Sequence, residues 1–144
     1  MNTSQLAIGV FDSGMGGLTV LRALREGLPQ ESFVYLGDTA RLPYGTKSPD
    51  TVKQYAMQMA KLLVERRIKA LVIACNTATT AALPYLQSML PEMPVLGVVS
   101  PGAAAAVVAT KNHHVLVLAT ETTIASNARS EEHTSELQSL RHIS

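Results

Sequence analysis

Residues 70–77 read Ala-Leu-Val-Ile-Ala-Cys-Asn-Thr, an apolar run that passes directly into a cysteine and two polar residues. Apolar and polar positions do not alternate within the run, which is typical of a β-strand covered on both faces. A helix is expected from about residue 77 to residue 90, ended by Pro91 and Pro94. A doubly covered strand followed by a helix indicates a parallel sheet with helices on both of its faces.

The rest of the chain repeats this alternation of strand and helix. Further strands are predicted at residues 7–11, 32–36, 95–99 and 115–119, and further helices at residues 16–28, 49–63 and 101–110. Ser48 is the expected N-cap of the second helix and Pro49 its first residue. The sequence therefore predicts an α/β fold with a parallel, doubly wound, flavodoxin-like sheet. Such sheets bind ligands at the carboxyl ends of their strands, so function is sought in the loops that follow the strands.

Composition excludes several classes of protein. The chain has 144 residues, enough for one ordinary domain, and 47% of them are hydrophobic, which argues against global disorder. Its net charge of +1 offers no basic field for nucleic acid. No apolar run approaches the roughly 20 residues of a membrane helix, and residues 1–10 lack a secretory signal, so the cytoplasm is the expected location. The single cysteine, Cys75, excludes an intrachain disulfide framework and a multi-cysteine metal site.

A glycine-rich loop, Asp12-Ser13-Gly14-Met15-Gly16-Gly17, follows the first predicted strand. Glycines allow a tight turn and a close approach of the backbone to a ligand, and the N–H groups of the next helix favour an anion there. The loop lacks the third glycine of a dinucleotide fingerprint, because Thr19 stands in its place, and it lacks the lysine of a phosphate loop. An ordinary structural turn would use the same glycines, but Asp12 adds a carboxylate placed to accept a proton or orient a neighbour.

The loop after the second strand, residues 38–47, contains the turn Pro43-Tyr44-Gly45. The Tyr44 hydroxyl could bond a substrate carboxylate or close a pocket. Taken alone, an ordinary loop with a packing tyrosine is the simpler interpretation. Tyr44 is therefore a candidate only in combination with the other loops.

The third loop begins at Cys75, where a buried strand meets the start of a helix. The N-terminus of a helix stabilises a thiolate, which makes the sulfur usable as a base or nucleophile. Asn76 and Thr77 can offer hydrogen-bond donors to a carboxylate at the same place. Free cysteines are more often inert core residues, but Cys75 lies at the carboxyl end of its strand among polar residues.

The residue types in these loops suit proton transfer. The sequence contains no recognisable cysteine–histidine pair of the protease type and no ligand set for a structural zinc. A thiol, a nearby carboxylate and several donors for an anion suit the abstraction of a proton next to a carboxylate.

Three motifs occur in order after three predicted strands. They are Val10-Phe11-Asp12-Ser13-Gly14-Met15-Gly16-Gly17-Leu18, Pro43-Tyr44-Gly45 and Ala74-Cys75-Asn76-Thr77-Ala78-Thr79. Together they resemble the glutamate racemase family, within the aspartate/glutamate racemase superfamily, and the similarity covers about residues 7–128. The resemblance implies a cofactor-independent interconversion of L- and D-glutamate that supplies D-glutamate for bacterial peptidoglycan.

The resemblance also implies two cysteines on opposite faces of the substrate α-carbon, one removing the proton and the other delivering it. Cys75 matches the first cysteine, and Asp12 matches the carboxylate near that thiol. Together with Asp12, the substrate-holding positions are matched by Ser13, Tyr44, Gly45, Asn76 and Thr77, and Thr79 is a minor candidate. No cofactor and no metal are implied, the partner is a small-molecule substrate, and a homodimer is allowed for the full-length enzyme.

The chain departs from the family pattern beyond residue 128. The family's second cysteine belongs to a Cys-Thr-His motif that this sequence does not contain, so we expect the 144-residue polypeptide not to racemise glutamate efficiently. The predicted organisation is a first α/β domain at residues 1–99, the truncated start of a second at residues 100–128, and a non-native tail at residues 129–144. Residues 129–139 resemble the translation of a sequencing adapter, which is why the tail is left out of the fold prediction.

Two other functions stay open at this point. A related enzyme, such as an aspartate or hydantoin racemase, would use the same thiol chemistry on another substrate. A non-catalytic flavodoxin-like module would bind an anion or a partner, and it would keep its function when Cys75 is replaced by serine.

Overall fold

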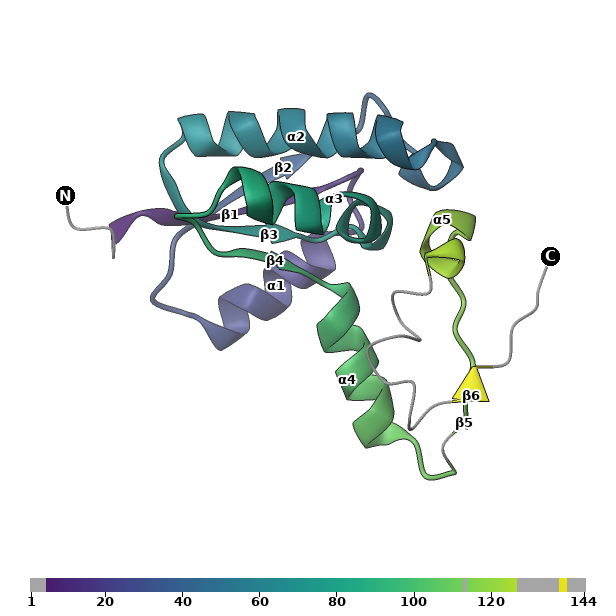
Figure 1. The fold of residues 1–144 in the computed structure, drawn as a ribbon. Helices are drawn as coiled ribbons and strands as arrows, with labels where there is room; N and C mark the ends of the chain where they lie inside the picture. The colour runs from purple at the N-terminus through teal and green to yellow at the C-terminus, as the bar shows by residue number, and fades with distance from the viewer. Residues whose placement is uncertain (1–4, 113, 127–137, 140–144) are drawn as a thin grey trace.

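A computed structural model gives the fold of the chain and describes residues 5–112, 114–126 and 138–139. Its centre is a four-stranded parallel sheet in the order β2-β1-β3-β4 (Figure 1). The strands are β1 (Ala7–Asp12), β2 (Phe33–Gly37), β3 (Ile68–Ile73) and β4 (Val95–Gly97). The prediction of a parallel α/β sheet is confirmed.

Three helices connect these strands and cover both faces of the sheet. They are α1 (Leu18–Gly27), α2 (Pro49–Glu65) and α3 (Asn76–Met89). Figure 1 shows α2 and α3 above the sheet and α1 below it, so the sheet is doubly wound. Ser48 caps α2 as predicted, since its Oγ accepts a hydrogen bond from the Thr51 N–H at 3.2 Å.

Side chains of the central strands are buried on both sides of the sheet. Phe11 of β1 belongs to the larger core with Leu63 of α2, whereas its neighbour Val10 belongs to the smaller core with Leu24 of α1. Successive side chains of a strand point to opposite faces, and Phe11 and Val10 are both fully buried. This burial explains why the strands carry apolar runs without alternation.

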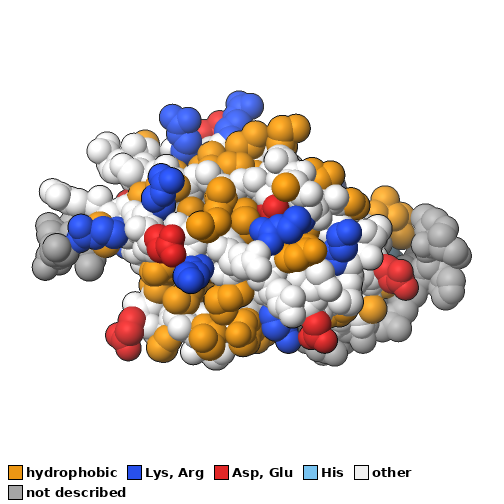
Figure 2. Space-filling view, turned by 90° about the horizontal axis from the view of Figure 1, so that it is seen from above, with side chains coloured by type: hydrophobic (Ala, Val, Ile, Leu, Met, Phe, Trp, Pro, Cys, Tyr) orange, Lys and Arg blue, Asp and Glu red, His pale blue; other side chains and the backbone are white. Residues whose placement is uncertain are grey.

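The outer surface above α2 and α3 carries no concentrated charge. Figure 2 shows apolar side chains on this face interspersed with separate basic and acidic ones. In the part of the chain that the structure describes, no helix is long and apolar enough to cross a bilayer.

The strand prediction for residues 95–99 is wrong at its end. β4 stops at Gly97, and Val99 already begins α4 (Val99–Ala109). Thr79 of α3 gives the physical reason: its Oγ1 lies 3.4 Å from the Val98 N–H that donates to it, and its Cγ2 would lie 2.2 Å from a Cβ on Gly97. The close contact with α3 therefore coincides with the point where the chain leaves the sheet.

The predicted fifth strand at residues 115–119 is also wrong. Only His114–Val115 forms a strand (β5), and it pairs with β6 (Gln138–Ser139) instead of joining the main sheet. A short helix that was not predicted, α5 (Glu121–Ala125), follows. Within the described residues no strand of the main sheet lies beside residues 116–119, so their apolar pattern does not produce a strand. Of the predicted tail, residues 129–137 and 140–144 lie outside the described residues.

Candidate active site

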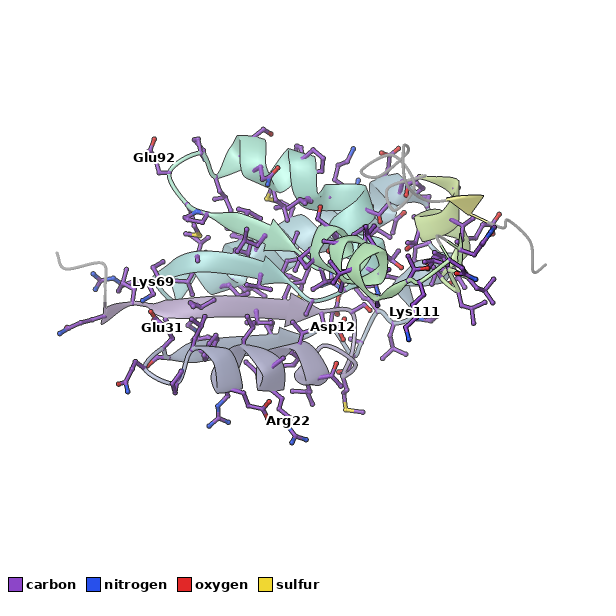
Figure 3. The ribbon with its side chains drawn as sticks, turned by 90° about the horizontal axis from the view of Figure 1, so that it is seen from below. Asp12, Arg22, Glu31, Lys69, Glu92 and Lys111 are labelled. Atoms are coloured by element: carbon purple, nitrogen blue, oxygen red, sulfur yellow. The ribbon has the colours of Figure 1, made fainter. Side chains whose placement is uncertain are left out.

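The loops at the carboxyl ends of β1 and β3 surround a cavity of about 740 Å³. Further walls come from Leu42 and Pro43 after β2 and from the segment that leads into α5. Figure 3 places Asp12 at this end of the sheet and Glu31 and Lys69 at the other end. The predicted site residues that line the cavity are Asp12, Ser13, Cys75, Asn76 and Thr77. The structure thus brings all three loops that the sequence singled out to one cavity, although the loop after β2 contributes Leu42 and Pro43 and not the predicted Tyr44 and Gly45.

Cys75 is the N-cap residue of α3. Its Sγ accepts a hydrogen bond from the Ala78 N–H at 3.4 Å and donates to the Ser13 Oγ at 3.4 Å. The side chain is buried, but it contributes to the cavity wall. The free N–H groups at a helix N-terminus favour negative charge beside them.

Asp12 is the last residue of β1, and the glycine-rich loop wraps around its carboxylate. Its Oδ2 accepts hydrogen bonds from the N–H groups of Gly14 at 3.1 Å and Gly17 at 2.9 Å. A Cβ on Gly17 would lie 2.6 Å from the Asp12 Cβ and 2.9 Å from the Ala74 Cβ, so this close approach requires glycine. The loop therefore holds a buried carboxylate at the wall of the cavity that contains Cys75.

Tyr44 belongs to the 3₁₀ turn η2 (Tyr44–Thr46), and its side chain is buried. The hydroxyl donates a hydrogen bond to Asp38 Oδ2 at 2.5 Å, and neither Tyr44 nor Gly45 is among the described residues that line the cavity. Burial, followed by the hydrogen bond to Asp38 and the Asp38 charge, raises the pKa of Tyr44 far above its ordinary value. The substrate-holding roles of Tyr44 and Gly45 stay predictions.

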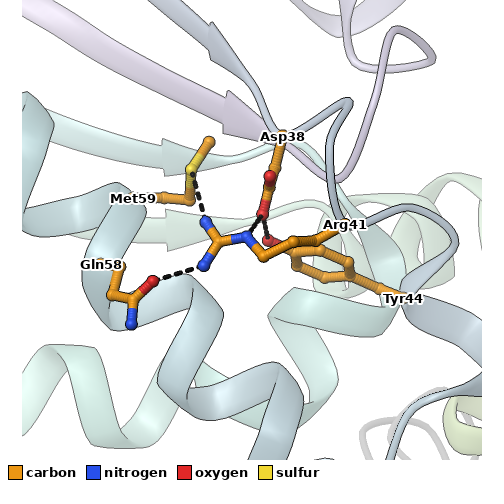
Figure 4. Close-up of polar contacts among 5 residues, drawn as sticks. All are labelled: Asp38, Arg41, Tyr44, Gln58 and Met59. Atoms are coloured by element: carbon orange, nitrogen blue, oxygen red, sulfur yellow. Dashed lines mark hydrogen bonds and ion pairs between the residues drawn. The ribbon is translucent and has the colours of Figure 1, made fainter.

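Arg41 fixes this loop to α2 (Figure 4). Its Nε lies 2.6 Å from Asp38 Oδ2, its Nη1 donates to Gln58 Oε1, and its Nη2 lies 3.7 Å from Met59 Sδ. The guanidinium carbon also lies 4.4 Å from the centre of the Tyr55 ring. Arg41 thus contacts its own loop on one side and α2 on the other.

Asp38 connects this cluster to the site, a role that the sequence analysis missed. Its Oδ2 accepts from both Tyr44 and Arg41, and its backbone N–H donates to the Asp12 carbonyl at 2.9 Å. The signal in the sequence was an acid and a base three residues apart, directly after a strand. Asp38 and Arg41 therefore hold the wall that Pro43 contributes to the cavity.

Thr120 and Thr123, also missed, line the cavity from the side of α5. The Thr120 hydroxyl lies 2.9 Å from the Thr77 hydroxyl and 3.1 Å from the Thr123 hydroxyl. A Cβ on Gly45 would lie 2.5 Å from Thr120 Cγ2, so the loop after β2 packs directly against this wall. Their signal was a cluster of hydroxyl residues immediately after an apolar run.

Thr79, the minor candidate, lies in the interior and contacts the backbone of β3. Its side chain is buried, its Oγ1 donates to the Ile73 carbonyl at 3.1 Å, and it is not among the described residues around the cavity. In residues 5–112, 114–126 and 138–139, no three His, Cys, Asp or Glu side chains gather where they could hold a metal ion.

Comparison with known sequences gives the family. The model of the Asp/Glu/Hydantoin racemase family matches residues 8–139. A glutamate racemase from Geobacter metallireducens is 56% identical over 122 residues, which are 85% of this chain and 45% of the relative. One from Staphylococcus haemolyticus is 55% identical over 121 residues, 84% of this chain and 45% of the relative. The chain spans slightly less than half the length of these curated relatives.

Solved structures agree with this assignment. Glutamate racemase isoform RacE1 from Bacillus anthracis superposes with a TM-score of 0.88 at 44% identity, covering 95% of this chain and 52% of that one. The enzyme from Francisella tularensis in complex with D-glutamate gives 0.84 at 39% identity, covering 94% and 51%. The Escherichia coli enzyme in complex with L-glutamate and the activator UDP-MurNAc-Ala gives 0.78 at 33% identity, covering 94% and 52%. The chain belongs to the Asp/Glu/hydantoin racemase family.

Proposed function

We propose that this chain is the Cys75-bearing part of a glutamate racemase, which interconverts L- and D-glutamate by acid–base chemistry without a cofactor. The observation that carries the proposal is the thiol itself. Cys75 caps α3, lies 3.4 Å from the Ser13 hydroxyl and lines the same cavity as Asp12. The relatives from F. tularensis and E. coli, solved with D- and L-glutamate, support the choice of substrate.

In this proposal the Cys75 thiolate removes the α-proton of glutamate. The negative charge that develops on the substrate carboxylate is met by donors fixed around the cavity, for which Ser13, Asn76 and Thr77 are the candidates. Asp12, held by the backbone N–H groups of its own loop, orients the thiol or accepts its proton.

Inversion needs a second acid on the opposite face of the α-carbon, because a single base would mostly return the proton to the side it came from. Cys75 is the only cysteine in the 144 residues, so the second thiol does not belong to this sequence. We therefore assign the proton transfer on one face to this chain and the transfer on the other face to the remainder of a full-length racemase.

The proposal extends to the biological setting and the organisation of the enzyme. The product, D-glutamate, would serve peptidoglycan synthesis in the cytoplasm, and the full-length enzyme is allowed to be a homodimer. The partner is a small molecule and not a nucleic acid. We keep the division into a first domain at residues 1–99 and the start of a second at residues 100–128, with residues 129–144 as a non-native tail.

The test uses alkylation of Cys75 by iodoacetamide in the 144-residue chain. D-glutamate or L-glutamate should slow the reaction several-fold, while aspartate should protect less. Equal rates with and without glutamate would overturn the substrate assignment, and stronger protection by aspartate would favour a related racemase. Cys75→Ser should abolish labelling, which shows that the signal comes from this thiol.

A second measurement tests the two-base mechanism. Circular dichroism of either glutamate enantiomer should stay constant in the presence of the 144-residue chain, since it contains one thiol. Racemisation at the rate of a two-base enzyme would refute the assignment of two thiols.

A further inference from the structure

The carbonyl group of Gly14 accepts a hydrogen bond from one residue of β2 and lies where another leaves space, and neither residue is among the described residues lining the cavity. The Tyr35 hydroxyl donates a hydrogen bond to the Gly14 oxygen at 3.2 Å. From the same strand, a Cβ on Gly37 would lie 2.3 Å from that oxygen, so the carbonyl occupies the space that a side chain at residue 37 would fill. One hydrogen bond thus holds this carbonyl of the glycine-rich loop, and the missing side chain of Gly37 leaves the space that it occupies.

The position of Gly14 makes this carbonyl important for the site. Its N–H donates to Asp12 Oδ2, and the residue before it, Ser13, accepts the hydrogen bond from Cys75 Sγ. Glycine has no side chain to restrict its backbone, so a loop with glycine at residues 14, 16 and 17 needs contacts from outside to keep one conformation.

Tyr35 remains a donor under ordinary conditions. Burial, and secondly the charge of Asp12, raise the pKa of its hydroxyl above the ordinary value for tyrosine. The phenol therefore keeps its proton, which a hydrogen bond to a carbonyl oxygen requires.

We propose that Tyr35 is a positioning residue of the site: its hydroxyl, with Gly37 beside it, holds the Gly14 carbonyl and thereby sets Ser13 and Asp12 against Cys75. What the thiol does to a substrate rests on the proposed function. The arrangement of Ser13 and Asp12 around Cys75 does not rest on the proposed function, because it can be measured through the reactivity of Cys75 alone.

The experiment compares Tyr35→Phe with Tyr85→Phe in the 144-residue chain. Both variants lose one phenol oxygen, but Tyr85 lies partly exposed on α3, away from the loop. Loss of a neutral hydrogen bond should loosen the contact of Ser13 with the thiol and raise the rate of alkylation by iodoacetamide about three- to tenfold in Tyr35→Phe. Tyr85→Phe should stay within about twofold of the unchanged chain.

A pair of glycine substitutions tests the role of Gly37 in the same way. Gly37→Ala should raise the alkylation rate at least as much as Tyr35→Phe, whereas Gly27→Ala should not, because no atom lies within 4 Å of a Cβ at Gly27. If Gly37→Ala does not fold, the tyrosine pair alone decides.

Urea unfolding of each variant separates positioning from general stability. A purely structural Tyr35 would lower the free energy of unfolding without changing the alkylation rate of the folded protein, as Val52→Ala in the core should do. Equal alkylation rates in folded Tyr35→Phe and Tyr85→Phe would overturn the proposal. Absence of protection by glutamate would instead count against the proposed function alone.

Discussion

Residues 5–97 and residues 99–126 carry similar apolar patterns but bury them very differently. Phe11, Leu71 and Ile73 of the main sheet are fully buried, whereas Leu116 is 60% exposed and Leu118 is 73% exposed. Figure 1 shows the reason, since α4 leads away from the sheet that α1, α2 and α3 cover. An apolar run becomes a strand only where a neighbouring strand completes its hydrogen bonds and packed elements complete its core.

The largest expected contrast is between two leucines. Leu71→Ala removes a fully buried side chain from β3 and should lower the free energy of unfolding by about 2–5 kcal/mol. Leu116→Ala removes a mostly exposed one and should change it by less than about 0.5 kcal/mol. Urea denaturation followed by circular dichroism measures both. Similar losses would mean that the second region has a core of its own and that the contrast between the regions is wrong.

The next largest effect concerns the cluster that joins the loop after β2 to α2. Arg41→Ala would leave the buried Asp38 carboxylate without its cation, which should cost about 3 kcal/mol. Arg22→Ala is the matched control, because its ion pair with Glu26 is exposed and should contribute less than about 1 kcal/mol. Equal effects of the two substitutions would show that Arg41 does not anchor the loop.

What the sequence allowed us to predict follows the same division. The strands predicted at residues 7–11 and 70–74 are observed at Ala7–Asp12 and Ile68–Ile73. These strands, the Ser48 cap and the placement of Cys75 depend on local pattern and on neighbours within the first region. The missing fifth strand at residues 115–119 could not be predicted from its composition, because apolar residues show that a strand is possible but not what lies beside it.

The site was predictable where one loop supplied all the contacts. Asp12 is held by the N–H groups of its own loop, so its position followed from the glycine-rich motif. The hydrogen bond from Tyr44 to Asp38 could not be predicted, because nothing in the local sequence indicates it. Thr120 was missed for a similar reason, since its contact with Thr77 joins residues far apart in the chain.

A smaller change in the free energy of unfolding is expected when the pH is raised. Because the pKa of Tyr44 is raised in the folded state, the folded protein holds this proton more tightly than the unfolded chain does. The stabilisation is fully present below the unfolded pKa of about 10 and is lost as the pH rises above it. Free energies of unfolding measured from about pH 8 to pH 11 should therefore fall more steeply in the unchanged chain than in Tyr44→Phe. Parallel curves for the two proteins would contradict this account of Tyr44.

The smallest effect on stability is expected where the two regions meet. In Gly45→Ala the new Cβ would lie 2.5 Å from Thr120 Cγ2, so Thr120 must move away from Thr77. The main sheet does not depend on this contact, and the free energy of unfolding should change by less than about 1 kcal/mol. The cavity wall does depend on it, so alkylation of Cys75 should become faster because the thiol is less enclosed. A loss of stability as large as that of Arg41→Ala would mean that α5 is integral to the first region, and the boundary between the regions would then lie beyond residue 126.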